Sequence, residues 1–365
     1  MAGCLSERYK DDLQKELTEI DIFTGVGDYD KIDRLVHEKR SSFSNEVFLA
    51  SEENDRVITG SNYHAYVKLS EGCNQSCSFC AIPSFKGKLH SRTLESLVKE
   101  VTNLVKKGYK DFSFVSQDSS SYLRDLGHND GLEQLIDAVE KIDGVKTARI
   151  LYLYPSTTTH NLIDKIADSK VFVNYFDMPL QHISQNMLKI MKRGKGAEKL
   201  IELMNYMRSK PNSFVRTTFI AGHPGESEDD FEELCSFVED FGFDRGNVFS
   251  YSDEEGTSAE TRDDKIEQEL IDERAEILGD IISQTTIKSL ENDIGKSFEV
   301  YIDGESEEHE YLLSARKTIW APQIDGEIYI NDNEDNIPIV FGEIYEVKAT
   351  QLAGDKLLAK IIRKV

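Results

Sequence analysis

Between residues 62 and 252, short hydrophobic runs alternate with longer amphipathic stretches. The runs predict strands at 65–69, 112–115, 147–154, 175–179, 215–220 and 247–250. Between them, apolar residues recur at helical spacing, as at Leu94, Leu97, Val101 and Leu104. Six strand–helix units in series predict an α/β fold with a parallel sheet, either open or closed into a partial (β/α)6 barrel. Either architecture places chemistry at the carboxyl ends of the strands.

The first 60 residues have a different pattern, which predicts helix, strand and helix. A charged segment comes first, an apolar strand covers 20–23, and a second helix runs from residue 29 to about residue 39. One strand and two helices cannot close a layered core. We therefore expect residues 1–60 to be the back half of an N-terminal α/β domain, with a structural tail packed on the next domain as the alternative.

After residue 252 the pattern changes twice. An acidic stretch leads into a connecting helix within 253–294, whose apolar face is predicted to hold Ile266, Leu270, Ile277, Leu278, Ile281 and Ile282. From 295 to 365, β-rich runs at 298–302, 327–330, 343–349 and 356–362 are separated by Gly and Asn or Asp turns. These runs predict a small antiparallel β-barrel. With 61–252 as the central domain, the chain divides into four segments.

Composition narrows the class of protein. The chain has 365 residues, enough for about two domains at roughly 100–200 residues each. It has 39% hydrophobic residues and contains no apolar run near the ~20 residues of a membrane span. A net charge of -24 disfavours non-specific binding to nucleic acid and favours a basic protein as partner. An odd total of five cysteines favours a reducing compartment, and with no targeting signal we expect the cytoplasm.

The strongest chemical signal is a cluster of cysteines directly after the first strand of the central domain. Cys73, Cys77 and Cys80 fall within eight residues, in Glu-Gly-Cys-Asn-Gln-Ser-Cys-Ser-Phe-Cys. A structural zinc site usually has four Cys or His ligands in pairs. Here no second pair lies nearby, and His90 is ten residues further on. An iron–sulfur cluster held by only three thiolates would leave one iron open for a substrate, and zinc remains the alternative.

Cys-x3-Cys-x-aromatic-Cys after a first strand resembles the motif of the radical S-adenosylmethionine (SAM) enzymes. The resemblance implies a TIM-type partial barrel in which Cys73, Cys77 and Cys80 hold a [4Fe-4S] cluster. It also implies that the open iron binds SAM, whose reductive cleavage gives a 5'-deoxyadenosyl radical. Such chemistry needs a cavity from which water is excluded.

Polar residues at the carboxyl ends of the later strands would line the mouth of that barrel. Within the resemblance, the candidates for binding SAM are Gln117, Asp118, Gln181, Gly222 and Glu226. Each of them has a turn or a helix cap as its alternative role. Arg216 and His182 are candidate catalytic contacts, either to the SAM carboxylate or to the substrate, with a buried structural pair as the alternative.

A closer family resemblance comes from Gly3-Cys4-Leu5, the cysteine motif and the C-terminal barrel, which looks like a TRAM domain. Together these features resemble the methylthiotransferases over essentially the whole chain. In that family the amino domain holds three further cysteines for a second, auxiliary [4Fe-4S] cluster. Cys4 matches the third of them, and the other two are not among these residues.

Within the family, one branch modifies tRNA adenosine and another methylthiolates the β-carbon of an aspartate in protein twelve of the small ribosomal subunit. The segments 150–156, 177–184, 216–220 and 321–326 resemble the ribosomal-protein branch. From 295 to 365 there are 14 Asp and Glu against 8 Lys and Arg, which suits a basic protein better than tRNA phosphates. We expect the ribosomal protein as substrate, a reductant such as flavodoxin or ferredoxin, and no membrane. The alternatives are a tRNA methylthiotransferase and a SAM-cleaving remnant without methylthio transfer.

Overall fold

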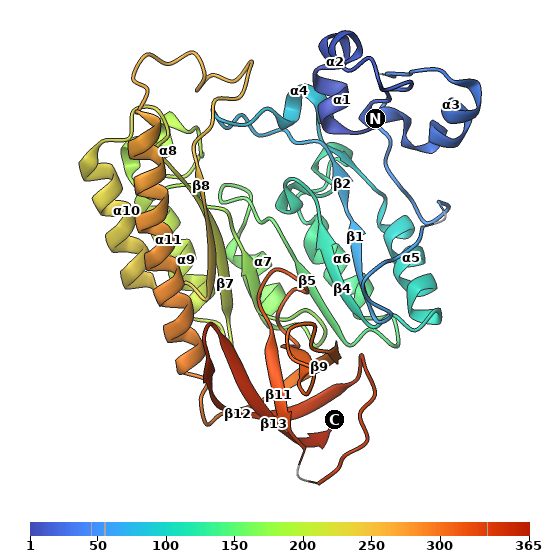
Figure 1. Cartoon of the computed structure of the whole chain (residues 1–365), viewed down its shortest axis with the longest axis vertical. Coiled ribbons are helices and arrows are strands. Elements are labelled where there is room, and N and C mark those ends of the chain that lie inside the picture. Colours follow the sequence, from blue (N-terminus) through green and yellow to red (C-terminus); the bar gives the residue numbers. More distant parts are fainter. Residues whose placement is uncertain (45, 55, 334) are drawn as a thin grey trace.

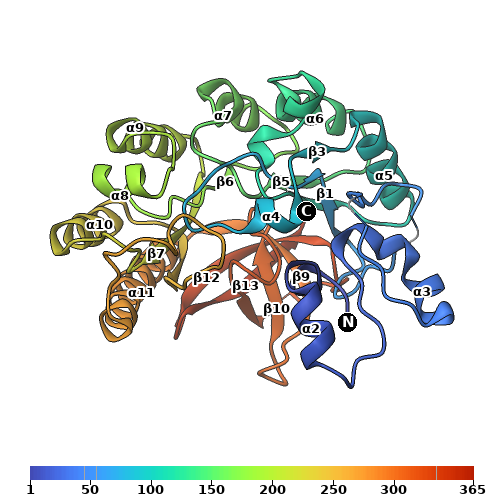
Figure 2. The same ribbon diagram turned by 90° about the horizontal axis from the view of Figure 1, so that it is seen from above.

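A computed structural model describes residues 1–44, 46–54, 56–333 and 335–365. Its centre is an arc of six parallel strands, seen from above in Figure 2. The strands are β1 (His64–Lys68), β4 (Asp111–Val115), β5 (Thr147–Ile150), β6 (Tyr175–Asp177), β7 (Phe214–Ala221) and β8 (Arg245–Ser250). All six predicted strands are present, and the arc confirms the expected partial barrel.

The arc consists of two three-stranded sheets, in the orders β1-β4-β5 and β6-β7-β8. Backbone bonds outside the regular strands join the two sheets, including Leu153 N to Asp177 O at 2.8 Å. Within the described chain no strand pairs β8 with β1, so both are edge strands. The partial barrel is therefore open on one side.

Helices cover the outer face of the arc, as Figure 2 shows. They are α5 (Leu94–Lys106), α6 (Gly131–Val139), α7 (His160–Ala167), α8 (Gln185–Ile190), α9 (Ala197–Arg208) and α10 (Glu228–Phe241), with short 3-10 turns η2 (Ser119–Ser121) and η3 (Arg124–Leu126) between them. In α5, Leu97, Val101 and Leu104 lie on one stripe and are buried against the sheet. No helix within the described ranges is long and apolar enough to cross a membrane.

The long helix α11 (Gln268–Glu291) packs against β8 and α10, but its buried face differs from the predicted one. Ile271, Leu278 and Ile282 are buried, whereas Leu270 and Ile277 are 38% and 42% exposed. Each residue advances the helix by about 100°, so a stripe centred on Ile271 and Leu278 turns their preceding neighbours outward.

The N-terminal segment contains α1 (Cys4–Arg8), α2 (Lys10–Glu16), the 3-10 helix η1 (Val26–Lys31) and α3 (Ile32–Glu38). The predicted strand at 20–23 is wrong. Thr24 makes only isolated bridges, to Ala2 and to Ser42, and a strand needs consecutive partners. Helix α1 packs against α4 (Ile82–Lys86), which places this segment beside the carboxyl ends of the strands (Figure 1).

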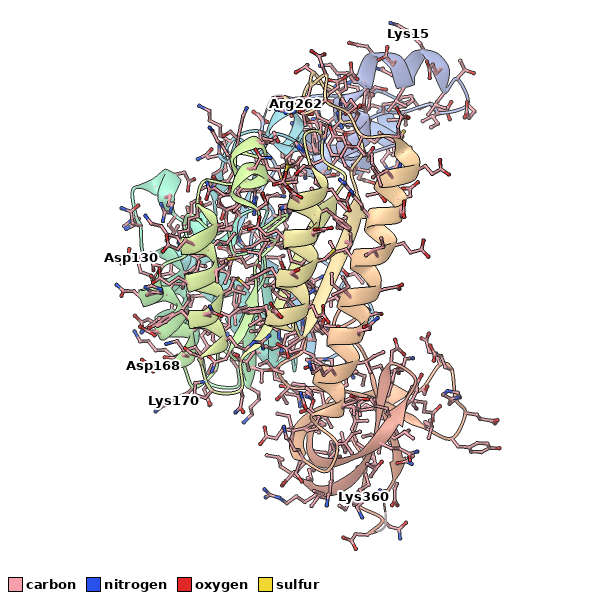
Figure 3. All side chains as sticks on the ribbon, turned by 90° about the vertical axis from the view of Figure 1, so that its left-hand side faces the viewer. Lys15, Asp130, Asp168, Lys170, Arg262 and Lys360 are labelled. Atoms are coloured by element: carbon pink, nitrogen blue, oxygen red, sulfur yellow. The ribbon has the colours of Figure 1, made fainter. Side chains whose placement is uncertain are left out.

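The C-terminal strands close into a barrel in the order β10-β11-β13-β12-β9. Their bounds are β9 (Ser297–Glu305), β10 (Leu313–Lys317), β11 (Ile328–Asp332), β12 (Ile344–Ala353) and β13 (Lys356–Lys364). The small barrel is thus confirmed, although β10 escaped prediction and β11 pairs with β13 in parallel. The barrel lies at the amino ends of the central strands, at the bottom of Figure 1 and below the long helix in Figure 3, where Lys360 marks it.

A buried ion cluster joins the two domains. Asp111 at the start of β4 accepts from Arg149 Nη2 of β5 at 2.8 Å and from Arg316 Nη2 of the C-terminal barrel at 2.6 Å. All three side chains are buried. Burial alone would raise the pKa of Asp111, but the two guanidinium groups outweigh it and hold the pKa far below its ordinary value.

Residues 320–326, between β10 and β11, leave the small barrel and occupy the open side of the central arc. We call them the inserted segment. The Tyr66 hydroxyl of β1 donates to Pro322 O at 3.0 Å, and the Arg245 guanidinium of β8 lies 5.7 Å from the Trp320 ring. The inserted segment therefore bridges the two edge strands.

Candidate active site

The cysteine loop leaves the central domain after β2 (Ser70–Glu71), which pairs with β3 (His90–Ser91). Gly72 makes this turn possible. Its φ is +78°, and a Cβ at this position would lie 2.1 Å from Lys88 O, so any other residue would clash with the backbone. The loop consequently folds back over the carboxyl ends of the strands.

All three cysteines of the loop line one cavity of about 700 Å³. The Gln75 backbone N–H points at Cys73 Sγ, 3.4 Å away, and Arg193 Nη1 donates to Cys77 Sγ at 3.2 Å. Donors of this kind stabilise a thiolate. Burial raises the pKa of the Cys73 thiol to about 11, so a bound metal would have to displace its proton.

The donor set, three thiols around one cavity, suits an iron–sulfur cluster. Among the described residues, no three His, Cys, Asp or Glu side chains are gathered closely enough to hold one metal ion. A four-iron cluster binds each thiolate on a different iron and so spreads its ligands more widely. Three cysteine thiols around one cavity therefore fit the cluster that the motif implies.

Hydrogen bonds attach the loop to the ends of two strands. Gln75 Nε2 donates to Asp118 Oδ2 at 2.8 Å, after β4, and Ser78 Oγ lies 3.0 Å from His223 Nε2, after β7. The Leu89 backbone N–H donates to Asn74 Oδ1 at 3.1 Å and closes the loop on itself. The cysteines are thus held by side chains that surround the mouth of the barrel.

The five residues predicted to bind SAM fall into two groups. Gln117 and Gln181 line the cavity, and each has a buried amide oxygen without a hydrogen-bond partner in the described chain. Asp118, Gly222 and Glu226 lie outside the lining. Glu226 accepts from the Gly222 N–H at 3.1 Å and from Arg274 Nη1 at 2.8 Å, so these residues shape the strand ends.

The two candidate catalytic residues are also separated. His182 is fully buried outside the cavity, and its Nδ1 accepts from the backbone of Ile183 and Ser184, both at 3.0 Å. Its Nε2 lies 3.5 Å from Glu226 Oε2, the arrangement of a buried pair. Arg216, in contrast, lines the cavity.

The cavity lining has an unusual charge for so acidic a chain. Within the described part of the chain it contains three cations, Lys68, Arg193 and Arg216, and no Asp or Glu. Arg193 was not predicted from the sequence, because it follows the short helix α8 and is part of no recognisable motif. Its guanidinium lies 4.4 Å from the Tyr154 ring and also donates to Pro179 O.

Cys4 lies apart from this cavity. It is exposed at the start of α1, and the cavity lining does not include it. The cysteine loop therefore gathers three of the four predicted cysteine ligands.

Comparison with known proteins agrees with this geometry. Residues 67–238 match the radical SAM superfamily and residues 294–362 match the TRAM domain. Among solved structures, coproporphyrinogen III oxidase (HemN) from Escherichia coli, a radical SAM enzyme, superposes with a TM-score of 0.50 at 15% identity. The superposition covers 64% of this chain and 57% of that one, and it supports the fold.

Sequence relatives are much closer. The chain is 80% identical over 365 residues to the ribosomal protein uS12 methylthiotransferase RimO of Aliarcobacter butzleri, and it covers 82% of that protein. It is 63% identical over 364 residues to the protein of the same name from Sulfurovum, again covering 82%. With a radical SAM domain, a TRAM domain and this identity, the chain belongs to the family of radical SAM methylthiotransferases named for ribosomal protein uS12.

Proposed function

We propose that the chain methylthiolates the β-carbon of an aspartate in ribosomal protein uS12. Relatives that carry the name uS12 methylthiotransferase share up to 80% of its residues across the full 365. The aspartate as target follows from the sequence resemblance described above. The physical argument for an aspartate comes from the charged residues that line the cavity.

The observation that carries the proposal is the sign of the charge in the cavity. Lys68, Arg193 and Arg216 are the charged residues of the described lining, in a chain of net charge -24. Their acidic partners lie outside the lining: Glu71 is 2.6 Å from Lys68, and Asp177 is 2.9 Å from Arg216. A carboxylate taken out of water needs cations or hydrogen-bond donors around it. An aspartate side chain carries such a carboxylate, whereas the base of a tRNA adenosine is neutral and does not need cations around it.

The chain's own residues would prepare the cavity for this chemistry. A [4Fe-4S] cluster and SAM, when bound, supply a radical that can take a hydrogen atom from carbon. Cys73, Cys77 and Cys80 would hold the cluster, and Gln117 and Gln181 offer unpartnered amide oxygens to SAM. Four aromatic residues line the cavity, namely Phe79, Tyr152, Tyr154 and Tyr251.

The outer surface favours a basic protein as the molecule that docks. The C-terminal barrel has 14 acidic against 8 basic residues within 295–365, and uS12 as a ribosomal protein would be Lys- and Arg-rich. The tRNA backbone has the opposite charge and would be repelled. A ribosomal substrate also agrees with the expected cytoplasmic location.

Cys4 and the electron donor complete the proposal. Cys4 is proposed as a ligand of a second [4Fe-4S] cluster, but it stands alone at the start of α1, so these residues by themselves do not form that site. We therefore assign no step to it. A flavodoxin or ferredoxin is proposed as the reductant.

The test is a competition between the two substrate classes. The complete protein, reconstituted anaerobically with iron, sulfide and SAM, is incubated with uS12 and with tRNA in one mixture. We expect mass spectrometry to find the methylthio group on an aspartate of uS12 and none on tRNA. Modification of tRNA alone would overturn the proposal in favour of the tRNA branch, and 5'-deoxyadenosine without any methylthio product would support the SAM-cleaving remnant.

A further inference from the structure

Arg216 enters the cavity from its floor. It lies in β7 five residues before Ala221, about 16 Å along the strand from the carboxyl end at a rise of ~3.3 Å per residue. The cysteine loop covers that carboxyl end. The Arg216 side chain lines the same cavity as the three cysteines, so it can meet a substrate carboxylate there.

Three elements hold the Arg216 guanidinium. Nη1 donates to Asp177 Oδ1 of β6 at 2.9 Å. Nη2 lies 2.7 Å from the Asn247 side-chain oxygen of β8, in the amide orientation that satisfies both groups of that side chain. Nε lies 3.5 Å from Asp325 Oδ1, which comes from the inserted segment of the C-terminal barrel.

Arg216 has more N–H groups than its three partners use. A guanidinium has five N–H groups, one at Nε and two at each terminal nitrogen. Asp177 and Asn247 use one on each terminal nitrogen, and Asp325 faces the single N–H at Nε. One N–H on Nη1 and one on Nη2 have no partner in the described chain, and both can donate to an incoming carboxylate.

Asp325 is placed by the inserted segment itself. Its Oδ2 accepts from the Ala321 N–H at 2.7 Å, which closes the segment into a turn. The following Gly326 has a φ of +112°, and a Cβ there would lie 2.3 Å from Arg245 Nη2. The side chain is fully buried. Its Oδ1 lies 3.5 Å from Arg216 Nε, and the Tyr175 hydroxyl of β6 interacts with the same carboxylate.

The charges around Arg216 leave room for an incoming anion. Asp177 and Asp325 face two guanidinium groups, because Arg245 is also close enough to feel the charge of Asp325. Burial raises the pKa of both carboxyl groups, that of Asp325 to about 6. The two carboxylates and the two guanidinium groups balance in charge, so binding of a third carboxylate depends on the two N–H groups of Arg216 that have no partner.

We propose that Asp325 is a positioning residue which, from the C-terminal barrel, fixes Arg216 so that its two remaining N–H groups receive the carboxylate of the substrate aspartate. The inference rests on the proposed function. It makes the C-terminal barrel part of the reaction site, in addition to any role in docking. It also gives a role to residues 321–326 of the inserted segment, which resemble the ribosomal-protein branch of the family.

The test measures how tightly the reconstituted complete protein binds uS12 and a uS12 variant whose target aspartate is replaced by asparagine. In the wild type the carboxylate should improve binding on the order of tenfold, the effect expected for a charge-assisted bidentate pair. Asp325→Ala should reduce that ratio to near one. Asp325→Asn keeps the shape and an acceptor for Ala321, and it should fall in between.

Two controls separate this effect from damage to the fold and from failure of the proposed function. Glu305→Gln removes one exposed carboxylate from β9 of the same barrel and should leave the ratio unchanged. Cleavage of SAM without substrate should also be unaffected in the Asp325 variants. If these variants weaken binding of both uS12 forms equally, or of neither, the positioning role is wrong; if the wild type fails to bind uS12, the proposed function itself is wrong.

Discussion

Cys73, Cys77 and Cys80 differ from Cys235 in what surrounds the sulfur. The first three line a common cavity with N–H donors beside two of them. Cys235 is half-buried on α10 against the hydrophobic core. Free cysteine in such surroundings behaves as a small apolar side chain.

Changing Cys73, Cys77 and Cys80 together to alanine should abolish cluster binding at this loop. We expect the chain reconstituted under anaerobic conditions to lose its bound iron and its visible absorbance, because no thiolate ligand remains there. Cys235→Ala is the matched control and should retain the iron of the wild type. Undiminished iron in the triple variant would refute the assignment.

His64 should make stability depend on pH. It is buried at the start of β1, with Nε2 3.0 Å from Ser113 Oγ, and burial lowers its pKa to about 3. Between that value and the ordinary 6.5, the unfolded chain binds a proton that the folded protein does not. Its contribution is therefore complete above pH 6.5 and decreases as the pH falls, by about 2 kcal/mol between pH 7 and pH 5.

Urea unfolding at several pH values measures this contribution. The free energy of unfolding of His64→Gln should change less between pH 7 and pH 5 than that of the wild type. His37→Gln removes an exposed histidine and should reproduce the wild-type slope. Parallel curves for all three proteins would contradict the prediction.

Among single residues, those that form a motif with a fixed spacing along the chain could be predicted from the sequence. The three cysteines of the loop are close in sequence, so their pattern was visible. Arg193 comes from the loop after α8 and Asp325 from another domain, and only the fold brings them to Cys77 and Arg216. His182, a candidate from its place at a strand end, is fully buried outside the cavity, and its Nδ1 accepts from the backbone of its own turn.

Among the elements, α10 has the best-defined start. Ser227 Oγ accepts from the Asp230 N–H, and the Asp230 carboxylate accepts from the Ser227 N–H at 3.1 Å, which is a capping box. Asp230 also accepts from Ser184 Oγ and from Asn186 Nδ2, next to and within α8. One carboxylate thus joins the beginnings of two helices.

Asp230→Ala should lower the free energy of unfolding by about 1–2 kcal/mol, since it removes the cap and its bonds to the other helix. Asp229→Ala removes an exposed acid from the same turn of the helix and should cost much less. Denaturant midpoints compare the two variants. Equal losses would show that Asp230 acts only through the charge of the helix terminus.

Elements with a strong period were predictable, and those defined by distant partners were not. The six central strands and α5 follow from their hydrophobic pattern. The supposed strand at 20–23 is apolar enough, yet only single bridges near it form. Strand β10 was not predicted because its own residues give no clear strand pattern. It is defined by its pairing with β9 and β11.

At the scale of the whole molecule, the cluster of Asp111, Arg149 and Arg316 connects the central domain to the C-terminal barrel. Asp111→Asn would leave two buried guanidinium groups without their anion, which costs about 3–5 kcal/mol. We expect a lower melting temperature and separate unfolding of the two domains in calorimetry. Asp303→Asn removes the more exposed acid 3.5 Å from Arg316 and should have a smaller effect.

If Asp111→Asn and Asp303→Asn destabilise the protein equally, the buried cluster does not hold the domains together. A single cooperative transition in both variants would lead to the same conclusion.

The negative surface should also control how the protein meets its substrate. Association with a Lys- and Arg-rich protein should slow as salt rises past ~0.15 M, where the screening length is about 8 Å. Stopped-flow mixing at several salt concentrations measures this rate. Association with uS12 that is independent of salt would mean that the acidic barrel does not guide the encounter.

The inserted segment has a consequence for how such proteins can be recombined. Because residues 320–326 contact both edge strands and Asp325 faces Arg216, the small barrel is not an interchangeable accessory. A chimera that exchanges it for another barrel would remove Asp325 from Arg216 and Pro322 from Tyr66 together with the acidic surface of the barrel. Recombination of this barrel would therefore have to keep residues 320–326 together with Arg216.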